Sequence, residues 1–247
     1  RRPNFAFDPE FKAPRSARRF VARKNVHDPL EACVNHILGH ECTHVPNRKR
    51  LSCPETVEEH EKYFYGPMSE ALGKVGKAGS VDSVTNFVED LIDNTFLAQG
   101  EEHAGLSLFY ADAAEKVGWA KFMDAFLRIQ LYCWGDKEDV DLLSQFMKKN
   151  DAKIVKPVQS FLRRLEKMHG KGKRLSQVEV RDYFSDRSHW EKVGVAFVEE
   201  LHELIPQSQD LPLLCSFGER MKQEMRDPIN RQGFARKRFE QGKKKPF

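Results

Sequence analysis

Apolar residues recur at helical spacing along most of this chain, and this periodicity constrains the fold more than any other feature. Over residues 81–98, the apolar positions that define one helix face are Val84, Phe87, Val88, Leu91 and Ile92. No convincing run of alternating β-branched residues, which would predict strands, is present. We therefore expect an all-α or mainly α fold.

The clearest helix start is at Asp28. Its side chain is suited to the N-cap, Pro29 fits the first helical position, and Glu31 suits the positive end of a helix. This helix should run to about Val45, because Pro46 ends it. The periodicity predicts further helices near residues 55–65, 67–75, 81–98, 102–117, 119–134, 137–149, 152–169, 187–204 and 211–226.

The chain divides by composition into four parts. Residues 1–27 are basic and contain three prolines, which predicts an irregular arm. A helical domain is expected over 28–170, and the glycine- and lysine-rich linker 170–174 separates it from a helical C-terminal subdomain over 171–230. Residues 231–247 form a basic tail.

Charge is concentrated at the two ends of the chain. The formal net charge is only +4, which does not by itself indicate a nucleic-acid binder. However, residues 15–24 hold five basic residues and no acidic one, and residues 231–247 hold seven basic residues and one acidic one. We expect a solvated tail, with binding of nucleic acid or another acidic partner through the basic termini as the alternative.

Cysteine content and hydropathy favour a cytoplasmic protein. The five cysteines are odd in number and none shows CxxC spacing, so neither a disulfide framework nor a cysteine zinc cluster is expected. No run of 18 apolar residues predicts a membrane span, and no signal peptide is visible. Because the chain begins with Arg1 rather than Met, a segment could precede it.

Residues 40–44 read H-E-C-T-H, an HExxH motif within the helix that begins at Asp28. Residues four apart lie one turn apart on one helix face, so His40 and His44 can bind one metal ion at about 2.0–2.1 Å. Glu41 is then near enough to reach a metal-bound water without binding the metal itself. We expect one Zn²⁺ per chain, with both histidines as ligands and Glu41 as the catalytic base.

A catalytic zinc usually has three protein ligands and one open position, so a third ligand is needed from another element. The helix predicted over 81–98 carries one polar stripe, formed by Asp82, Asn86, Glu89 and Asp93. If this helix packs beside the HExxH helix, it can direct that stripe at the metal. Asp90 is the nearest alternative ligand, although it points about 100° away around the helix. Glu101 and Glu102 are further alternatives.

Together these features resemble the gluzincin group of zinc peptidases, which includes thermolysin-like enzymes and their small minimal relatives. In that group HExxH is followed by a second helix with an ExxxD element, and here residues 89–93 read E-D-L-I-D. The resemblance implies that Glu89 is the third zinc ligand and that Asp93 accepts a hydrogen bond from a ligand histidine. It also implies a zincin-like pair of active-site helices inside a metallopeptidase-like domain over 28–170. The resemblance covers only residues 28–46 and 80–98.

The implied function is zinc-dependent hydrolysis of peptide (amide) bonds in a peptide or protein substrate. Glu41 would activate the zinc-bound water and then deliver the proton to the leaving amine. Two alternatives remain: a zinc-binding interaction protein without turnover, and a module that binds nucleic acid or an acidic partner through the basic ends. Candidate donors to the oxyanion are Tyr63, Tyr65, His103 and Tyr110. His36, one turn before His40, either lines the site or is a buried structural histidine.

Overall fold

The computed structural model describes residue 13 and residues 15–43, 61–98, 102–117, 121–148, 151–170 and 172–206. These residues belong to one of the two units into which the chain divides, Arg1–Ser208. They are mostly helical and contain no strand, which confirms the all-α expectation for this part of the chain. None of the helices described here is long and apolar enough to cross a membrane.

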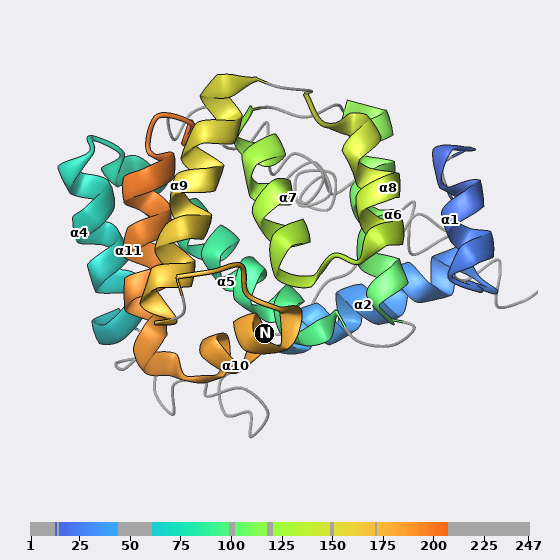
Figure 1. Ribbon diagram of the computed structural model, residues 1–247, viewed down its shortest axis with the longest axis horizontal. Helices are drawn as coiled ribbons and strands as arrows, with labels where there is room; N and C mark the ends of the chain where they lie inside the picture. The colour runs from blue at the N-terminus through green and yellow to red at the C-terminus, as the bar shows by residue number, and fades with distance from the viewer. Residues whose placement is uncertain are drawn as a thin grey trace, which may run out of the picture. The chain divides into compact units, whose positions relative to one another are not determined.

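The elements follow one another as a series of helices (Figure 1). In chain order they are η1 (Arg15–Ala17), α1 (Arg18–Arg23), α2 (Pro29–Thr43), η2 (Glu61–Tyr65), α4 (Gly66–Lys74), η3 (Ala78–Ser80), α5 (Val81–Leu97), α6 (Glu102–Val117), α7 (Lys121–Trp134), α8 (Lys137–Leu143), η4 (Ser144–Phe146), α9 (Ala152–Met168), α10 (Gln177–Ser185), η5 (Arg187–His189) and α11 (Trp190–Leu201).

Helix α2, which carries most of the HExxH motif, begins where the sequence predicts. The Asp28 carboxylate accepts hydrogen bonds from the backbone N–H groups of Leu30 at 2.9 Å and Glu31 at 3.1 Å. These two donors have no partner inside the helix, so the side chain of Asp28 fixes the first turn. Pro29 is the first helical residue, as expected.

Residues 15–23 are helical, which differs from the irregular arm that the sequence predicts over 1–27. Phe20 in α1 is buried. Lys24 pairs with Asp136, its ammonium nitrogen lies 3.6 Å from a carboxylate oxygen of Asp139, and Arg23 lies 3.6 Å from Asp141. Apolar burial and these ion pairs attach α1 to α8, so part of the basic segment is neutralised within the chain itself.

Helix α10 follows the linker at 170–174 and was not predicted. Ser176 and Glu179 form a reciprocal capping box at its start, in which each side chain accepts from the backbone N–H of the other residue. It packs against α5 and α7, and the next helix, α11, packs against α4 and α9. In the described part of the chain, the helices that follow the linker therefore contact helices that precede it, and the subdomain boundary expected at residue 170 stays a prediction.

The centre of the core is a set of phenylalanines from four helices. Phe87 of α5 contacts Phe122 and Phe126 of α7 edge to face, with ring centroids 5.1 and 5.0 Å apart. Phe197 of α11 contacts Phe161 of α9 in the same manner at 5.6 Å. Edge-to-face pairs add to the stabilisation that burial provides. The apolar face predicted for α5 is thus confirmed as a core face, and it fixes the rotation of α5 about its own axis.

A buried carboxylate joins α6 to α8. Asp139 is fully buried, accepts a hydrogen bond from the Ser107 hydroxyl at 2.7 Å, and lies 2.8 Å from Nε2 of His103. Burial acts to raise the pKa of Asp139, but the imidazole of His103 and the hydrogen bonds outweigh it. The pKa of this carboxyl therefore lies well below its ordinary value of 3.8.

Asp139→Asn is expected to lower the free energy of unfolding at neutral pH by about 3 kcal/mol, because it removes one partner of a buried ion pair. Since the pKa of Asp139 is lower in the folded state, its ionised form stabilises the fold fully above the unfolded value of 3.8 and progressively less as pH falls below it. Urea unfolding of the wild type and Asp139→Asn should therefore show a difference in the free energy of unfolding that becomes smaller as the pH is lowered. Asp141→Asn, an exposed position in the same helix, should change stability little. A difference independent of pH would contradict this prediction.

Candidate metal centre

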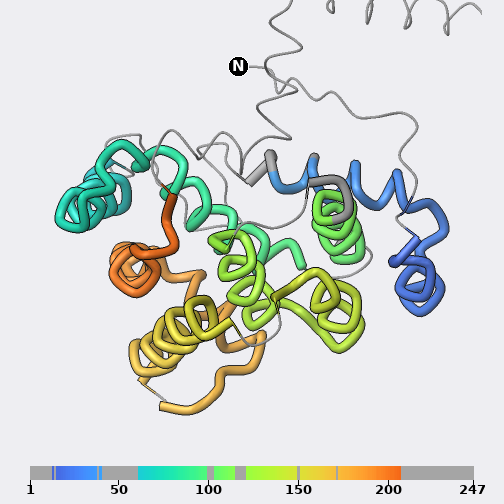
Figure 2. The backbone as a smooth tube through the Cα atoms, turned by 90° about the horizontal axis from the view of Figure 1, so that it is seen from above, coloured from blue at the N-terminus to red at the C-terminus, as the bar shows by residue number. Residues whose placement is uncertain are grey.

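Helix α2 packs against both α5 and α6, and the contact with α6 is very close (Figure 2). A Cβ atom at Gly105 of α6 would lie 2.0 Å from the backbone oxygen of Ala32, so only glycine fits there. The buried Cys33 thiol donates to the backbone oxygen of Gly105 at 3.4 Å. Burial, with a smaller contribution from Asp112, raises the pKa of Cys33 to about 12. Cys33 is therefore a packing residue and not a reactive thiolate.

His40 contacts α5 with both ring nitrogens. Its Nδ1 atom lies 3.0 Å from Oδ1 of Asn94, and its Nε2 atom lies 3.1 Å from Oδ1 of Asp90. Asp90 and Asn94 are one turn apart on α5, so the imidazole ring lies across one stripe of that helix. The His40 side chain is 16% exposed and that of Asp90 20%, so this contact is partly shielded from water.

The two α5 side chains that contact His40 are themselves held by neighbours. The Asn86 amide donates to Oδ2 of Asp90 at 3.2 Å, which leaves Oδ1 directed at His40. Asn94 is buried, and its amide nitrogen lies 3.5 Å from the Tyr110 hydroxyl of α6, which leaves its oxygen for His40. Asn86, Asp90 and Asn94 therefore form a single polar stripe on α5 that faces the HExxH helix.

The predicted carboxylates lie one position earlier on α5. Glu89 is half-buried and Asp93 is buried. Adjacent helix residues point about 100° apart, so Glu89 and Asp93 lie on a different stripe from the pair that contacts His40. Glu41 lies within α2, whereas His44 and Glu101 lie outside the described residues. The roles of Glu41, His44, Glu89 and Asp93 therefore stay predictions.

The sequence did not identify Asn94 as a functional residue. The sequence signal for it is the i, i+4, i+8 spacing of Asn86, Asp90 and Asn94, which is as regular as the spacing of the stripe that contains Glu89 and Asp93. The competing stripe runs through Asp82 and Asp93, of which the first is exposed and the second is buried. The choice between them depends on how α5 is rotated against its neighbours.

His36 lies behind His40 on the same face of α2. It is buried, and the centroids of the two rings are 6.1 Å apart. Burial, followed by the proximity of His40, lowers the pKa of His36 to about 3, so its ring is neutral near pH 7. His36 is therefore a buried structural histidine, which is one of the two interpretations that the sequence leaves open. Its ring lies next to that of the candidate ligand His40.

Of the four candidate oxyanion donors, Tyr110 is the one that adjoins this polar stripe. It is 7% exposed, and burial together with the charge of Asp90 raises its pKa, so its hydroxyl remains a neutral donor. His103 instead pairs with Asp139, and Tyr65 donates to Asp82. Tyr63 is 49% exposed.

Within the described residues, no group of three or more His, Cys, Asp or Glu side chains is arranged to hold a metal ion. His40 and Asp90 supply two potential ligands. A complete site would therefore need a ligand from outside these residues, and His44 is the ligand that the sequence predicts there.

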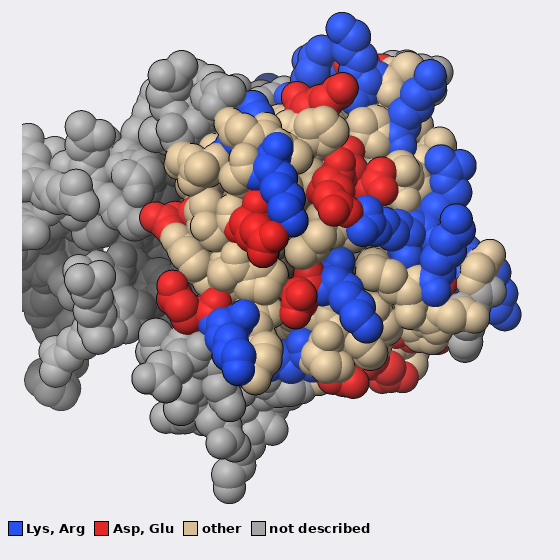
Figure 3. All heavy atoms as spheres, turned by 90° about the vertical axis from the view of Figure 1, so that its left-hand side faces the viewer, with Lys and Arg blue, Asp and Glu red and all other residues tan. Residues whose placement is uncertain are grey.

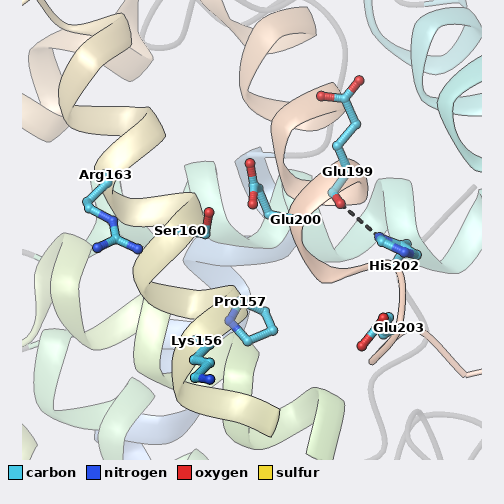
Figure 4. Close-up of a pocket in the computed structure, with 8 residues that line it drawn as sticks. All are labelled: Lys156, Pro157, Ser160, Arg163, Glu199, Glu200, His202 and Glu203. Carbon is cyan, nitrogen blue, oxygen red and sulfur yellow. Dashed lines mark hydrogen bonds between the residues drawn. The ribbon is translucent and has the colours of Figure 1, made fainter. Parts of the chain in front are cut away.

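A separate groove of about 520 Å³ lies between α9 and the end of α11 (Figure 4). The residues that line it are Lys156, Pro157, Ser160, Arg163, Glu199, Glu200, His202 and Glu203. Its basic side chains come from α9 and its acidic ones from α11 and the turn that follows, so the two walls neutralise each other. Figure 3 likewise shows acidic and basic side chains interspersed on the face that carries α4. The charges of this groove do not select an anionic partner.

Comparison of the chain with models of known protein families, with curated proteins and with solved structures found no match. The candidate metal centre therefore rests on the HExxH motif and on the contacts of His40.

Proposed function

We propose that this chain is a zinc-dependent hydrolase of peptide bonds, in which His40, His44 and a carboxylate of α5 bind the metal and Glu41 is the catalytic base. The observation that supports it most directly is the contact of His40 with α5. One ring nitrogen lies 3.1 Å from a carboxylate oxygen and the other lies 3.0 Å from an amide oxygen. A histidine that binds zinc needs this combination of a metal-facing nitrogen and a second nitrogen held by an acceptor.

The donor set fits zinc in both chemistry and spacing. Two imidazoles and one carboxylate are a known ligand combination for catalytic zinc, at bond lengths of about 2.0–2.2 Å. Two ligand atoms at those distances in a tetrahedron are about 3.3–3.5 Å apart. The Nε2 atom of His40 and the Oδ1 atom of Asp90 are separated by 3.1 Å, so a small displacement of either would accommodate the ion between them.

In the proposed reaction, the zinc ion, Glu41 and Asn94 each have a distinct role. Bound zinc would lower the pKa of water to about 7 and polarise the substrate carbonyl. Glu41 accepts the proton of the attacking water and passes it to the leaving amine. Asn94 fixes the orientation of the His40 ring through Nδ1. The peptide substrate follows from the resemblance to gluzincins, because the residues alone define only amide hydrolysis.

Metal analysis of the purified protein tests the proposal. We expect one tightly held zinc per chain in the wild type and its loss in His40→Ala, because that variant keeps only one of the two motif histidines. His202→Ala, which removes a histidine beyond the end of α11, should keep its zinc and serves as the control. Circular dichroism should show that both variants are folded. A folded wild-type protein without zinc, even after incubation with the metal, would refute the proposal.

A further inference from the structure

We infer that Asp90 is the third zinc ligand and that Asn94 is the residue that positions His40, in place of the Glu89–Asp93 pair that the sequence motif predicts. The inference rests on the proposed zinc function and assigns residues to it. It follows from three features of the contact between α2 and α5.

The first feature is the hydrogen-bonding pattern around His40. The Asn94 oxygen can only accept, so the Nδ1 atom of His40 must carry the proton in their 3.0 Å contact. The Nε2 atom lies 3.1 Å from Oδ1 of Asp90, and without a metal a proton on Nε2 would join these two atoms as an ion pair. In the proposed zinc site the metal takes the place of that proton, so Nε2 and Oδ1 are the two atoms placed to bind it.

The second feature is the orientation of the Asp90 carboxylate. The Asn86 amide donates to Oδ2 at 3.2 Å, and Oδ1 lies 3.1 Å from Nε2 of His40. A carboxylate held by one oxygen is suited to bind a metal through the other, because its rotation is already restricted. Asn86 is the previous residue of the same stripe, so α5 supplies both the ligand and the group that orients it.

The third feature is the rotation of α5. The core contacts of Phe87 with Phe122 and Phe126 fix which side of the helix faces inward. With that rotation, Asp90 and Asn94 reach the imidazole of His40. Glu89 points about 100° away from Asp90 around the helix axis. To replace Asp90 as the partner of His40, Glu89 would require α5 to turn against its own core contacts.

Zinc affinities of matched variants test the assignment. Asp90→Asn should weaken zinc binding by about 100-fold or more, measured by competition with a chelator, because losing a ligand costs more than losing an outer partner. Glu89→Gln, the neighbouring isosteric change, should bind zinc within about threefold of the wild type. Asn94→Leu should weaken binding about 10–100-fold, whereas Asn94→Asp, which keeps an acceptor oxygen, should bind zinc at least as well as the wild type.

Cobalt substitution gives a readout that does not depend on activity or on the size of an affinity change. With Co²⁺ in place of zinc, Asp90→Cys should add a thiolate-to-metal charge-transfer band that the wild type lacks, because a thiolate would then bind the ion directly. Glu89→Cys should add no such band. Asn94→Leu should shift the visible cobalt bands without removing them, since it alters a ligand's orientation only.

The outcomes separate this inference from the proposed function. A wild-type protein that binds no zinc refutes the proposed function and the inference with it. A wild type that binds zinc, together with a charge-transfer band in Glu89→Cys and none in Asp90→Cys, refutes the inference alone. Retention of wild-type affinity by Asp90→Asn would also refute it.

Discussion

Glu41→Gln is expected to reduce hydrolysis of a fluorescently labelled protein substrate by about 10²–10⁴-fold, while zinc stays bound. The amide has nearly the shape of the carboxylate but cannot accept the proton of the attacking water. Because Glu41 is the base and not a ligand in the proposed mechanism, metal content and thermal stability should match those of the wild type.

The control for this experiment is Glu31→Gln, an exposed glutamate in the first turn of the same helix. It changes the charge of α2 by the same amount and should leave the rate unchanged. Wild-type rates in Glu41→Gln with zinc bound would show that another group is the base. A wild-type protein that holds zinc but hydrolyses no peptide bond would favour the alternative of a non-catalytic zinc-binding protein.

The long helices could be predicted from the sequence because their local signals and their packing agree. The Asp28 cap and Pro29 set the start of α2, and the apolar face of α5 became its core face. Local consistency of this kind makes a helix predictable without tertiary information. Within the residues that the structure describes, the sequence does not predict two short α-helices, α1 and α10. In α1 the only strongly apolar buried side chain is Phe20, and in α10 the capping pair was present but the apolar face is short.

The choice of the third ligand shows what sequence alone does not determine. Glu89 and Asp90 are adjacent carboxylates on one helix, and each begins an i, i+4 pair with a second oxygen-bearing residue. Which pair faces His40 depends on the rotation of α5, which the phenylalanine contacts with α7 determine. Those contacts join residues far apart in the chain, so no local pattern encodes them. The family motif favours one pair and the contacts of His40 favour the other.

The basic segment at residues 15–24 illustrates the same point for charge. Its composition suits an anionic partner, yet Lys24 pairs with Asp136 and Arg23 lies near Asp141. The acidic partner of these residues is therefore found within the chain, on α8. The tail at 231–247 lies outside the described residues, and its role stays a prediction.

The position of α2, and with it the proposed metal site, depends on a single glycine of α6. In Gly105→Ala the new Cβ atom would lie 2.0 Å from the backbone oxygen of Ala32 and 2.5 Å from its carbonyl carbon, where ordinary contacts are 3.4–4 Å. Both are backbone atoms and cannot rotate away, so α2 must move outward by more than an ångström. We expect a loss of about 3 kcal/mol or more in the free energy of unfolding, at the upper end of the cost of overpacking.

The same displacement should weaken zinc binding, because it moves α2 and the His40 ring relative to Asp90 and Asn94. Gly73→Ala in α4 is the matched control, since a Cβ atom there meets nothing within 4 Å. In an exposed helical position that change should stabilise the protein by about 0.5–1 kcal/mol and leave zinc affinity unchanged. Urea unfolding and zinc titration of both variants measure the two effects. If Gly105→Ala unfolds like the wild type, α2 and α6 do not approach as closely as described. The distances from His40 to Asp90 and Asn94 would then no longer support the proposed metal site.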